Sequence, residues 1–108
     1  MIPEIKEVKD TSSDLFNERL TPRAIVEVYG YDIKIDGDDP TCGLWFVSEN
    51  NVETKATIVA ENKPSKIIAL IPELSPGKWQ LKVVTQYSGG GNLVKLPKVF
   101  VFPKKLTV

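Results

Sequence analysis

Residues 64–88, PSKIIALIPELSPGKWQLKVVTQYS, decide the fold. An apolar run at 67–71 leads into the turn-forming residues 73–77. The run that follows alternates between two faces, and one face receives Trp79, Leu81, Val83, Thr85 and Tyr87. A period of two is typical of a half-buried strand, because successive side chains point to opposite faces of the pleat. We therefore predict two strands that meet at this turn, with Trp79, Leu81, Val83 and Tyr87 facing the interior of a β-sandwich.

Working outward, the rest of the chain repeats this pattern of short runs and turns. Strand-like runs occupy residues 3–9, 24–29, 43–47, 52–60 and 93–102. Turn signals every ~8 to 12 residues are typical of a sandwich. No stretch longer than one turn has helical periodicity. The sequence therefore predicts an all-β fold, an immunoglobulin-like β-sandwich of seven to eight antiparallel strands that forms a single domain over residues 1–108.

Four local features add detail to this prediction. Pro3 lacks a backbone donor, which suits an edge strand at residues 3–9. Ser13 is expected to cap a single helical turn. The continuous apolar run at residues 43–47 favours a strand covered on both faces. The alternation slips by one residue near Val59, which indicates a β-bulge.

Composition restricts the class of protein. With 42% hydrophobic and 26% charged residues, the chain is typical of a soluble globular domain. Cys42 is the single cysteine and cannot form an internal disulfide, which favours a reducing compartment. Residues 1–10 lack the basic start and apolar segment of a secretory signal. No apolar run approaches the ~18 to 20 residues that cross a bilayer. We therefore expect a cytoplasmic domain without membrane contact.

Formal charge is distributed unevenly along the chain. Residues 1–54 contain five basic and twelve acidic residues, whereas residues 55–108 contain nine basic and two acidic residues. Such asymmetry can mark a charged binding surface. In a sandwich, however, strands from both halves lie side by side, so we prefer the interpretation that the two halves attract each other.

Residue types needed for most catalysis and for zinc binding are missing. The chain has no histidine, so a Ser or Cys nucleophile lacks its commonest activating base. A zinc site would lack its usual Cys and His ligands. Cys42 is most simply a small buried hydrophobic residue, with a reactive thiol as the alternative. We therefore predict that the domain is not an enzyme and has no cofactor.

One acidic cluster is a candidate calcium site. It consists of Asp32, Asp36, Asp38 and Asp39. Calcium prefers several oxygen ligands from one short flexible loop, although this cluster lacks the acidic residue that completes an EF-hand loop. Aspartates are also common in tight turns, where they bond to the local backbone. Calcium binding and an ordinary turn are the two interpretations, and we prefer the turn.

Two groups of side chains are candidate binding residues. Trp45 and Phe46 are adjacent in a strand, so one should face the core and the other outward, where an exposed aromatic residue can mark an interaction surface. The alternative, which we prefer, is that these aromatic residues pack in the core or against another domain. The second group comprises Lys78, Lys82, Lys95, Lys98, Lys104 and Lys105. These lysines could gather on one sheet face and contact phosphates. Lysines also keep outward and edge positions soluble, so direct nucleic-acid contact is an alternative that we do not favour.

The segment LSPGKWQLKV at residues 74–83 resembles the turn-then-strand signature of immunoglobulin-like and fibronectin-type modules. In those modules a corner aromatic residue hydrogen-bonds back across the turn. Trp79 occupies this position in place of the usual tyrosine. Because an indole N–H can only donate, we expect its partner to be a backbone carbonyl upstream.

A wider resemblance extends over nearly the whole chain. The segments that carry it are PEIKEV (3–8), LTP (20–22), VYGYDIKI (28–35), GLWF (43–46), NKPS (62–65), IPELSPG (71–77) and TQY (85–87). Together they resemble an uncharacterised bacterial family, an immunoglobulin-like domain of unknown function. That domain is commonly found at the C-terminus of proteins whose N-terminal part is related to HU-type DNA-binding proteins. A weaker likeness to IPT/TIG-type sandwich domains rests on Pro3, Gly30 and the Pro-Gly turn.

The resemblance implies a fold and a context rather than an activity. It implies a non-catalytic accessory module whose partner is another domain of the same polypeptide or another protein. A nucleoid-associated location follows if the HU-related context holds. The alternative is a surface module of the adhesion type that binds carbohydrate or protein, which is motivated by the aromatic residues and the acidic loop.

Overall fold

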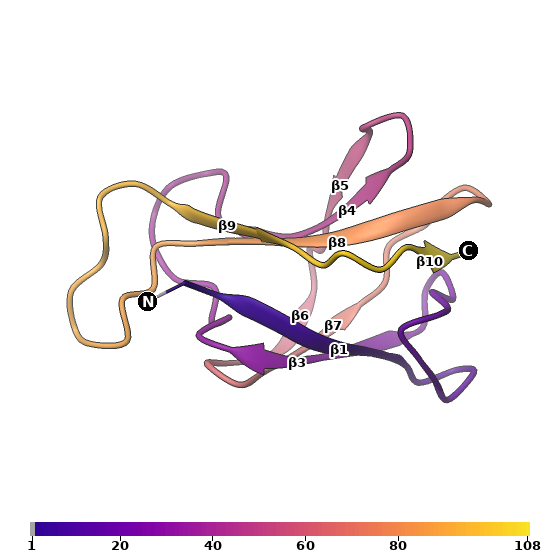
Figure 1. Cartoon of the computed structure of the whole chain (residues 1–108), viewed down its shortest axis with the longest axis horizontal. Coiled ribbons are helices and arrows are strands. Elements are labelled where there is room, and N and C mark those ends of the chain that lie inside the picture. Colours follow the sequence, from indigo (N-terminus) through magenta and orange to yellow (C-terminus); the bar gives the residue numbers. More distant parts are fainter. Residues whose placement is uncertain (1) are drawn as a thin grey trace.

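The two strands predicted in residues 64–88 lie in different sheets. The computed structural model describes residues 2–108, and it assigns β7 (Lys66–Leu70) to one sheet and β8 (Lys78–Thr85) to the other (Figure 1). The turn between them therefore carries the chain across the sandwich and does not close a hairpin. Trp79 stabilises this crossing, because its Nε1 donates a hydrogen bond to the backbone carbonyl of Ser75 at 2.9 Å. The predicted upstream carbonyl is thus confirmed.

Two antiparallel sheets make up the sandwich (Figure 1). The first has the order β2-β1-β3-β7-β6 and contains β1 (Glu4–Asp10), β2 (Leu15–Phe16), β3 (Ile25–Tyr31) and β6 (Val59–Lys63). The second has the order β10-β8-β4-β5, with β9 also paired to β8, and contains β4 (Gly43–Ser48), β5 (Glu53–Lys55), β9 (Lys98–Val101) and β10 (Leu106–Thr107). The predicted all-β, immunoglobulin-like sandwich is confirmed.

Two very short strands account for the difference between the ten strands observed in residues 2–108 and the seven to eight strands predicted. Ten strands occur in residues 2–108, but β2 and β10 have two residues each, which leaves eight longer strands. The same residues contain no helix that could cross a membrane. An isolated parallel bridge between Arg19 and Thr107 connects the segment between β2 and β3 to β10.

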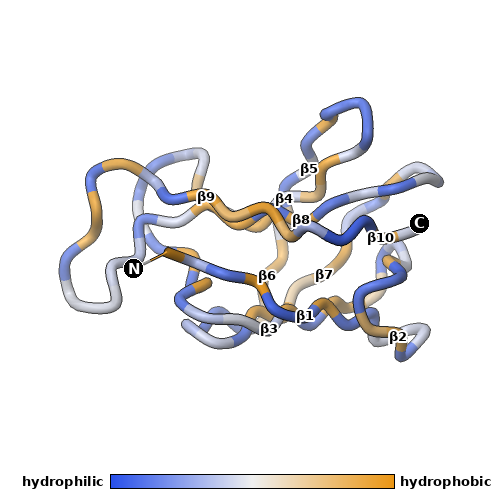
Figure 2. Tube along the Cα trace, in the orientation of Figure 1, coloured by the Kyte–Doolittle hydropathy of each residue, from blue (hydrophilic) through white to orange (hydrophobic). Residues whose placement is uncertain are grey.

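Alternating side chains from the two sheets fill the core. From β8, Leu81 and Val83 are fully buried and Trp79 is 5% exposed. Apolar and polar residues follow one another along β1 (Figure 2). Tyr87 was expected on the same inward face but lies beyond the end of β8 and is half-buried, so that prediction is wrong. The reason is local: the backbone N–H of Tyr87 donates to Thr85 Oγ1 at 3.1 Å, which turns the chain away from the sheet.

Residues 52–60 belong to two strands and not to one. β5 lies in the second sheet and β6 in the first, and residues 56–58 connect them. The predicted bulge is confirmed, because the register between β6 and β7 shifts between Val59 and Glu61. The slip in alternation therefore has two causes, the crossing between sheets and the bulge.

Three other expectations for strands need adjustment. In the apolar run at 43–47, Leu44 and Phe46 are fully buried but Trp45 is half-exposed, so coverage on both faces is wrong. Within 93–102, the strand is limited to β9, since Pro97 precedes it and residues 93–97 form a loop. β1 lies near an edge as predicted, with β2 covering it only at its last two residues.

Asp10 organises the segment where a helical turn was expected. Residues 11–14 form a turn instead, so the expectation of a capped helix is wrong. Asp10 Oδ2 accepts hydrogen bonds from the hydroxyls of Ser13 and Thr21, both at 2.7 Å, and from the Ser13 N–H at 3.2 Å. Oδ1 accepts the Thr21 N–H at 3.2 Å. Burial raises the pKa of Asp10, but these hydrogen bonds outweigh it and hold the pKa below its ordinary value.

Candidate functional site

Strand register builds a continuous outward row across the second sheet. Lys55 of β5 lies opposite Trp45 of β4, which lies opposite Lys82 of β8, which lies opposite Val101 of β9. A second pair, Val84 and Val99, lies beside this row. We call these six residues the Trp45 face: Trp45, Lys55, Lys82, Val84, Val99 and Val101.

Trp45 lies at the centre of the row. Its Nε1 donates a hydrogen bond to the backbone carbonyl of Thr41 at 2.9 Å, so the indole polar group is satisfied within the domain. The ammonium groups of Lys55 and Lys82 lie 5.5 and 5.7 Å from the ring centroid, within the range of a cation–π contact. The position of the indole is thereby restrained by neighbours on both adjacent strands and by the backbone of Thr41.

The charge of Lys82 is already compensated inside the domain. Its Nζ lies 2.7 Å from Glu53 Oε2, and its side chain is 18% exposed. A carboxylate and an ammonium that neutralise each other on a sheet face cost less to cover than either charge alone. This part of the face can therefore be buried by a partner without leaving an unpaired charge.

The valines give the face its apolar part. Val84 is 4% exposed, whereas Val99 and Val101 are 54% and 44% exposed. Exposed branched residues beside a half-buried tryptophan form the kind of apolar surface that marks interaction sites. The arrangement offers apolar packing area next to a paired charge, so it is suited to binding another surface.

The comparisons with known proteins agree with this fold. A family described as a domain of unknown function (DUF4469) with an Ig-like fold matches residues 4–100. The chain belongs to this family. No curated protein is similar enough to match.

One solved structure is similar to this DUF4469 domain over most of its length. It is the crystal structure of a candidate bacterial DNA-binding protein from Bacteroides vulgatus ATCC 8482, with a TM-score of 0.87 and 28% sequence identity. The match covers 94% of this chain and 46% of that chain. The chain therefore spans less than half the length of this relative.

The predicted division between Trp45 and Phe46 is confirmed in the DUF4469 domain. Phe46 is fully buried in the core, and Trp45 points outward from the same strand. The sequence did not indicate Lys55, because its position beside Trp45 depends on how β5 pairs with β4. It also did not indicate Val99 and Val101, although their alternation between Pro97 and Pro103 was a usable signal.

The candidate lysines do not gather on one face. Lys78 and Lys82 share the outward side of β8. Lys98 lies opposite Thr85, so along β9 it alternates with the outward residues Val99 and Val101. Lys95 lies in the loop before β9. Lys78 Nζ is 2.7 Å from Thr107 Oγ1. These lysines therefore do not form the single face that the sequence left open as the less favoured alternative, since tertiary pairing separates residues that the sequence places near each other.

The acidic loop forms turns in the DUF4469 domain. Asp36 Oδ1 accepts the N–H of Gly37 at 3.0 Å, and Asp39 Oδ1 accepts the N–H and hydroxyl of Thr41 at 2.9 and 2.6 Å. The hydrogen bonds from Thr41 lower the pKa of Asp39. No three Asp, Glu, Cys or His side chains converge as metal ligands in residues 2–108, and this includes Asp32 and Asp38. The preferred interpretation as a turn matches these bonds.

Cys42 is placed as a buried residue. Its Sγ lies 3.8 Å from Gln86 Oε1. Burial and then the negative charge of Asp39 raise the pKa of the Cys42 thiol. A raised pKa keeps the thiol protonated at neutral pH, which disfavours nucleophilic chemistry.

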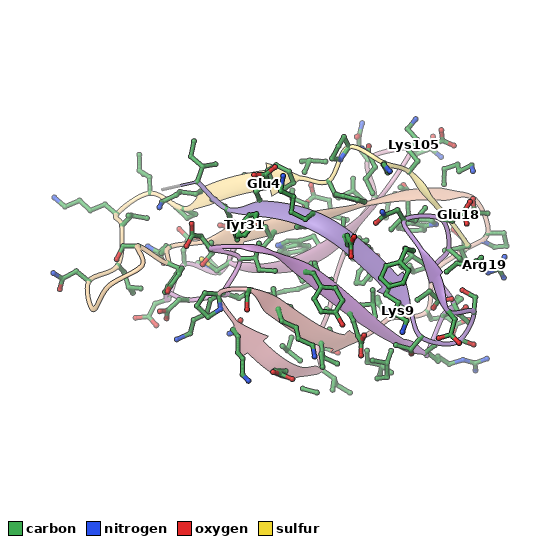
Figure 3. The ribbon with its side chains drawn as sticks, turned by 60° about the horizontal axis from the view of Figure 1, so that its bottom comes forward. Glu4, Lys9, Glu18, Arg19, Tyr31 and Lys105 are labelled. Atoms are coloured by element: carbon green, nitrogen blue, oxygen red, sulfur yellow. The ribbon has the colours of Figure 1, made fainter. Side chains whose placement is uncertain are left out.

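A shallow depression lies on the outer face of the opposite sheet, which faces the viewer in Figure 3. It measures about 340 Å³ and includes Lys6, Tyr29 and Tyr31 in its lining. Tyr31 is 61% exposed, and Lys6 Nζ lies 5.8 Å from its ring. Figure 3 shows Tyr31 and Lys9 at opposite ends of the paired strands β1 and β3. Its lining combines the charged side chains of Lys6 and Glu7 with the rings of Tyr29 and Tyr31.

Proposed function

We propose that the DUF4469 domain is a non-catalytic interaction module that contacts another protein domain through the Trp45 face. The observation that carries this proposal is the pair of exposed valines on β9, Val99 and Val101, on the same outward face as Trp45. Lys82 lies between Trp45 and Val101, and Glu53 compensates its charge. Apolar area at the centre of a contact, with charges paired around it, is the usual arrangement of a protein–protein interface.

We further propose that the partner is the DNA-binding part of a longer bacterial protein, and that this domain is accessory and works in the cytoplasm at the nucleoid. The B. vulgatus relative supports this, because more than half of that candidate DNA-binding protein lies outside the match. The resemblance to domains that accompany HU-related proteins supports it further.

The charges of the domain do not favour direct phosphate binding. Lys+Arg and Asp+Glu are equal at 14 each, which gives a formal net charge of zero. Arg23, one of the two arginines, lies 3.4 Å from Glu73. Nucleic-acid-binding domains usually concentrate unpaired basic residues on one face. An adhesion module is the less favoured alternative, because the carboxylates of Asp36 and Asp39 already accept hydrogen bonds from neighbouring backbone N–H groups.

A DNA titration tests the accessory role. The 108-residue chain and the whole B. vulgatus relative are titrated with the same generic DNA duplex at low salt. We expect the whole relative to bind at least about tenfold more tightly than this chain, because phosphate contacts dominate such binding. Equal, salt-sensitive binding by the isolated chain would refute the accessory role, and so would a relative that does not bind DNA.

A further inference from the structure

Within residues 2–108, β9 forms an open edge of the second sheet. It pairs with β8 on one side, and β1 of the other sheet approaches it without pairing. The backbone N–H of Phe102 donates to the carbonyl of Leu81 at 2.9 Å. In antiparallel pairs, residues that bond to the neighbouring strand alternate with residues that do not. The backbone groups of Val99 and Val101 therefore point away from β8.

Two prolines limit this edge. Pro97 and Pro103 occupy alternate positions in line with Val99 and Val101, so their backbone nitrogens would point to the same open side. Neither proline has a backbone N–H. A proline at an edge position prevents pairing there. The edge therefore offers two donors, from Val99 and Val101, and this is enough for one short extended segment. It is too short to template a long sheet.

The side chains at this edge are apolar and accessible. Val99 and Val101 point outward, are 54% and 44% exposed, and continue the Trp45 face. In a sheet, branched apolar residues pair favourably with apolar residues on the adjacent strand. An incoming strand would thus gain both backbone hydrogen bonds and side-chain contacts.

The C-terminal stretch of sequence that contains β9 is basic. Residues 74–108 contain six lysines and no acidic residue. Lys95 and Lys104 flank β9, are exposed, and form no ion pair within residues 2–108. Complementary charge selects a partner and speeds its association. A segment with acidic residues at both ends fits this edge.

We propose that the β9 edge binds an extended segment of a partner protein by β-strand addition, and that this segment has apolar residues at alternate positions and acidic residues at both ends. Strand addition of this kind takes its affinity from main-chain hydrogen bonds and its specificity from alternate side chains. The inference rests on the proposed function, since it specifies how the interaction module holds its partner.

A second copy of this chain fits the edge less well. Two β9 strands paired antiparallel about Phe100 would bring Lys95 of one copy toward Lys104 of the other. Like charges that face each other across a strand pair are destabilising. Duplex DNA would neutralise the lysines but would leave Val99 and Val101 without apolar contacts. The acidic extended segment satisfies both requirements.

Amide hydrogen exchange, measured by NMR on the 108-residue chain, tests the proposal. The probe is the peptide acetyl-EEVTVTVEE-amide, and its two controls carry lysine in place of glutamate or N-methyl groups on the central amides. The N-methyl control changes the probe alone, so it does not depend on the folding of any variant. With saturating acidic peptide we expect exchange at Val99 and Val101 to slow at least about tenfold, and to stay unchanged with either control.

A pair of substitutions tests the assigned geometry. Val101→Pro removes a donor at the open edge and leaves the bonds to β8, so we expect a folded domain that no longer binds the peptide. Phe100→Pro is the matched control, because it removes an N–H that faces β8 and should lower Tm more strongly.

Several outcomes would overturn strand addition. One is that no peptide slows exchange at Val99 and Val101, and another is that the lysine peptide slows it as much as the acidic peptide does. A third is that only duplex DNA slows it, and a fourth is that exchange slows as the chain concentration rises in the absence of peptide. The last outcome would identify a second copy as the occupant. If the acidic peptide does not slow exchange and the chain still binds DNA weakly, strand addition is refuted but the proposed function is not. Tight DNA binding by the chain refutes the proposed function itself.

Discussion

Asp10 connects three parts of the chain through one carboxylate. The residue is fully buried, and its two oxygens accept four hydrogen bonds from Ser13 and Thr21. These bonds fix the segment between β1 and β3, which also pairs with the C-terminal strand through Arg19, labelled at the side of the molecule in Figure 3. Hydrogen bonds to the Asp10 carboxylate therefore stabilise a turn in the region where the sequence suggested a helical turn.

Asp10→Asn should destabilise the domain. An amide cannot accept all four hydrogen bonds, and bonds to a charged group are the stronger ones, so we expect a loss of about 1 to 3 kcal/mol in the free energy of unfolding. Asp14→Asn is the matched control in the same loop, because Asp14 is exposed and lies 3.7 Å from Lys9. Urea denaturation checks both variants, and equal stability of the two would contradict the role of Asp10.

The same carboxylate should make stability depend on pH. Because the pKa of Asp10 is lower in the folded state, its contribution is present above the unfolded pKa and is lost as pH falls through the folded pKa. The difference in unfolding free energy between wild type and Asp10→Asn should therefore shrink below about pH 4. Denaturation curves between neutral and acidic pH measure this difference, and a gap that widens in acid would show that the sign is wrong.

Trp79 and Trp45 should respond differently to the same substitution. Trp79→Phe removes the bond to the Ser75 carbonyl and leaves unfilled volume in the core, so we expect a loss of about 1 to 3 kcal/mol. Trp45→Phe alters an outward residue, and we expect a loss below about 1 kcal/mol. Thermal or urea unfolding of the two variants measures the difference. A larger loss for Trp45 would contradict their placement.

At the scale of the elements, the pairing of β1 with β3 depends on a glycine. The register between these strands shifts between Ile5 and Glu7, next to Gly30. A Cβ added at Gly30 would lie 2.0 Å from the backbone oxygen of Glu4 and 3.0 Å from Ile5 Cα. Since both neighbours are backbone atoms, the strands would have to separate locally.

Gly30→Ala should therefore weaken the first sheet. We expect a loss of about 2 to 3 kcal/mol, as found for overpacked sites whose neighbours cannot move freely. Gly90→Ala is the matched control, since nothing lies within 4 Å of its added Cβ, and its effect should stay within about 0.5 kcal/mol. Tm values for the two variants decide the matter, and a neutral Gly30→Ala would show that the close approach is not required.

The elements also show what sequence could and could not predict. Alternation placed Trp79, Leu81 and Val83 correctly, because their burial depends on the period of one strand. It failed where the chain changes sheets, as in residues 52–60, because a change of sheet is set by distant packing and not by local period. It predicted that one of Trp45 and Phe46 faces outward, but the lysines that surround Trp45 come from separate strands.

At the scale of the whole molecule, ion pairs join the acidic and basic halves of the sequence. Lys82 lies 2.7 Å from Glu53, and Lys105 lies 3.3 Å from Glu49. Each pair joins a basic residue of residues 55–108 to an acidic residue of residues 1–54. The charge asymmetry of the sequence is thus partly cancelled in space, as expected.

The central claim is that this domain works by contacting a partner through β9 and the Trp45 face. It is tested most directly by amide hydrogen exchange on the whole B. vulgatus relative, compared with the 46% of that chain that matches this domain. We predict slower exchange in the longer protein at the positions that align with Val99 and Val101. Unchanged exchange there, or slowing confined to the outer face of the first sheet around Tyr31, would contradict this account.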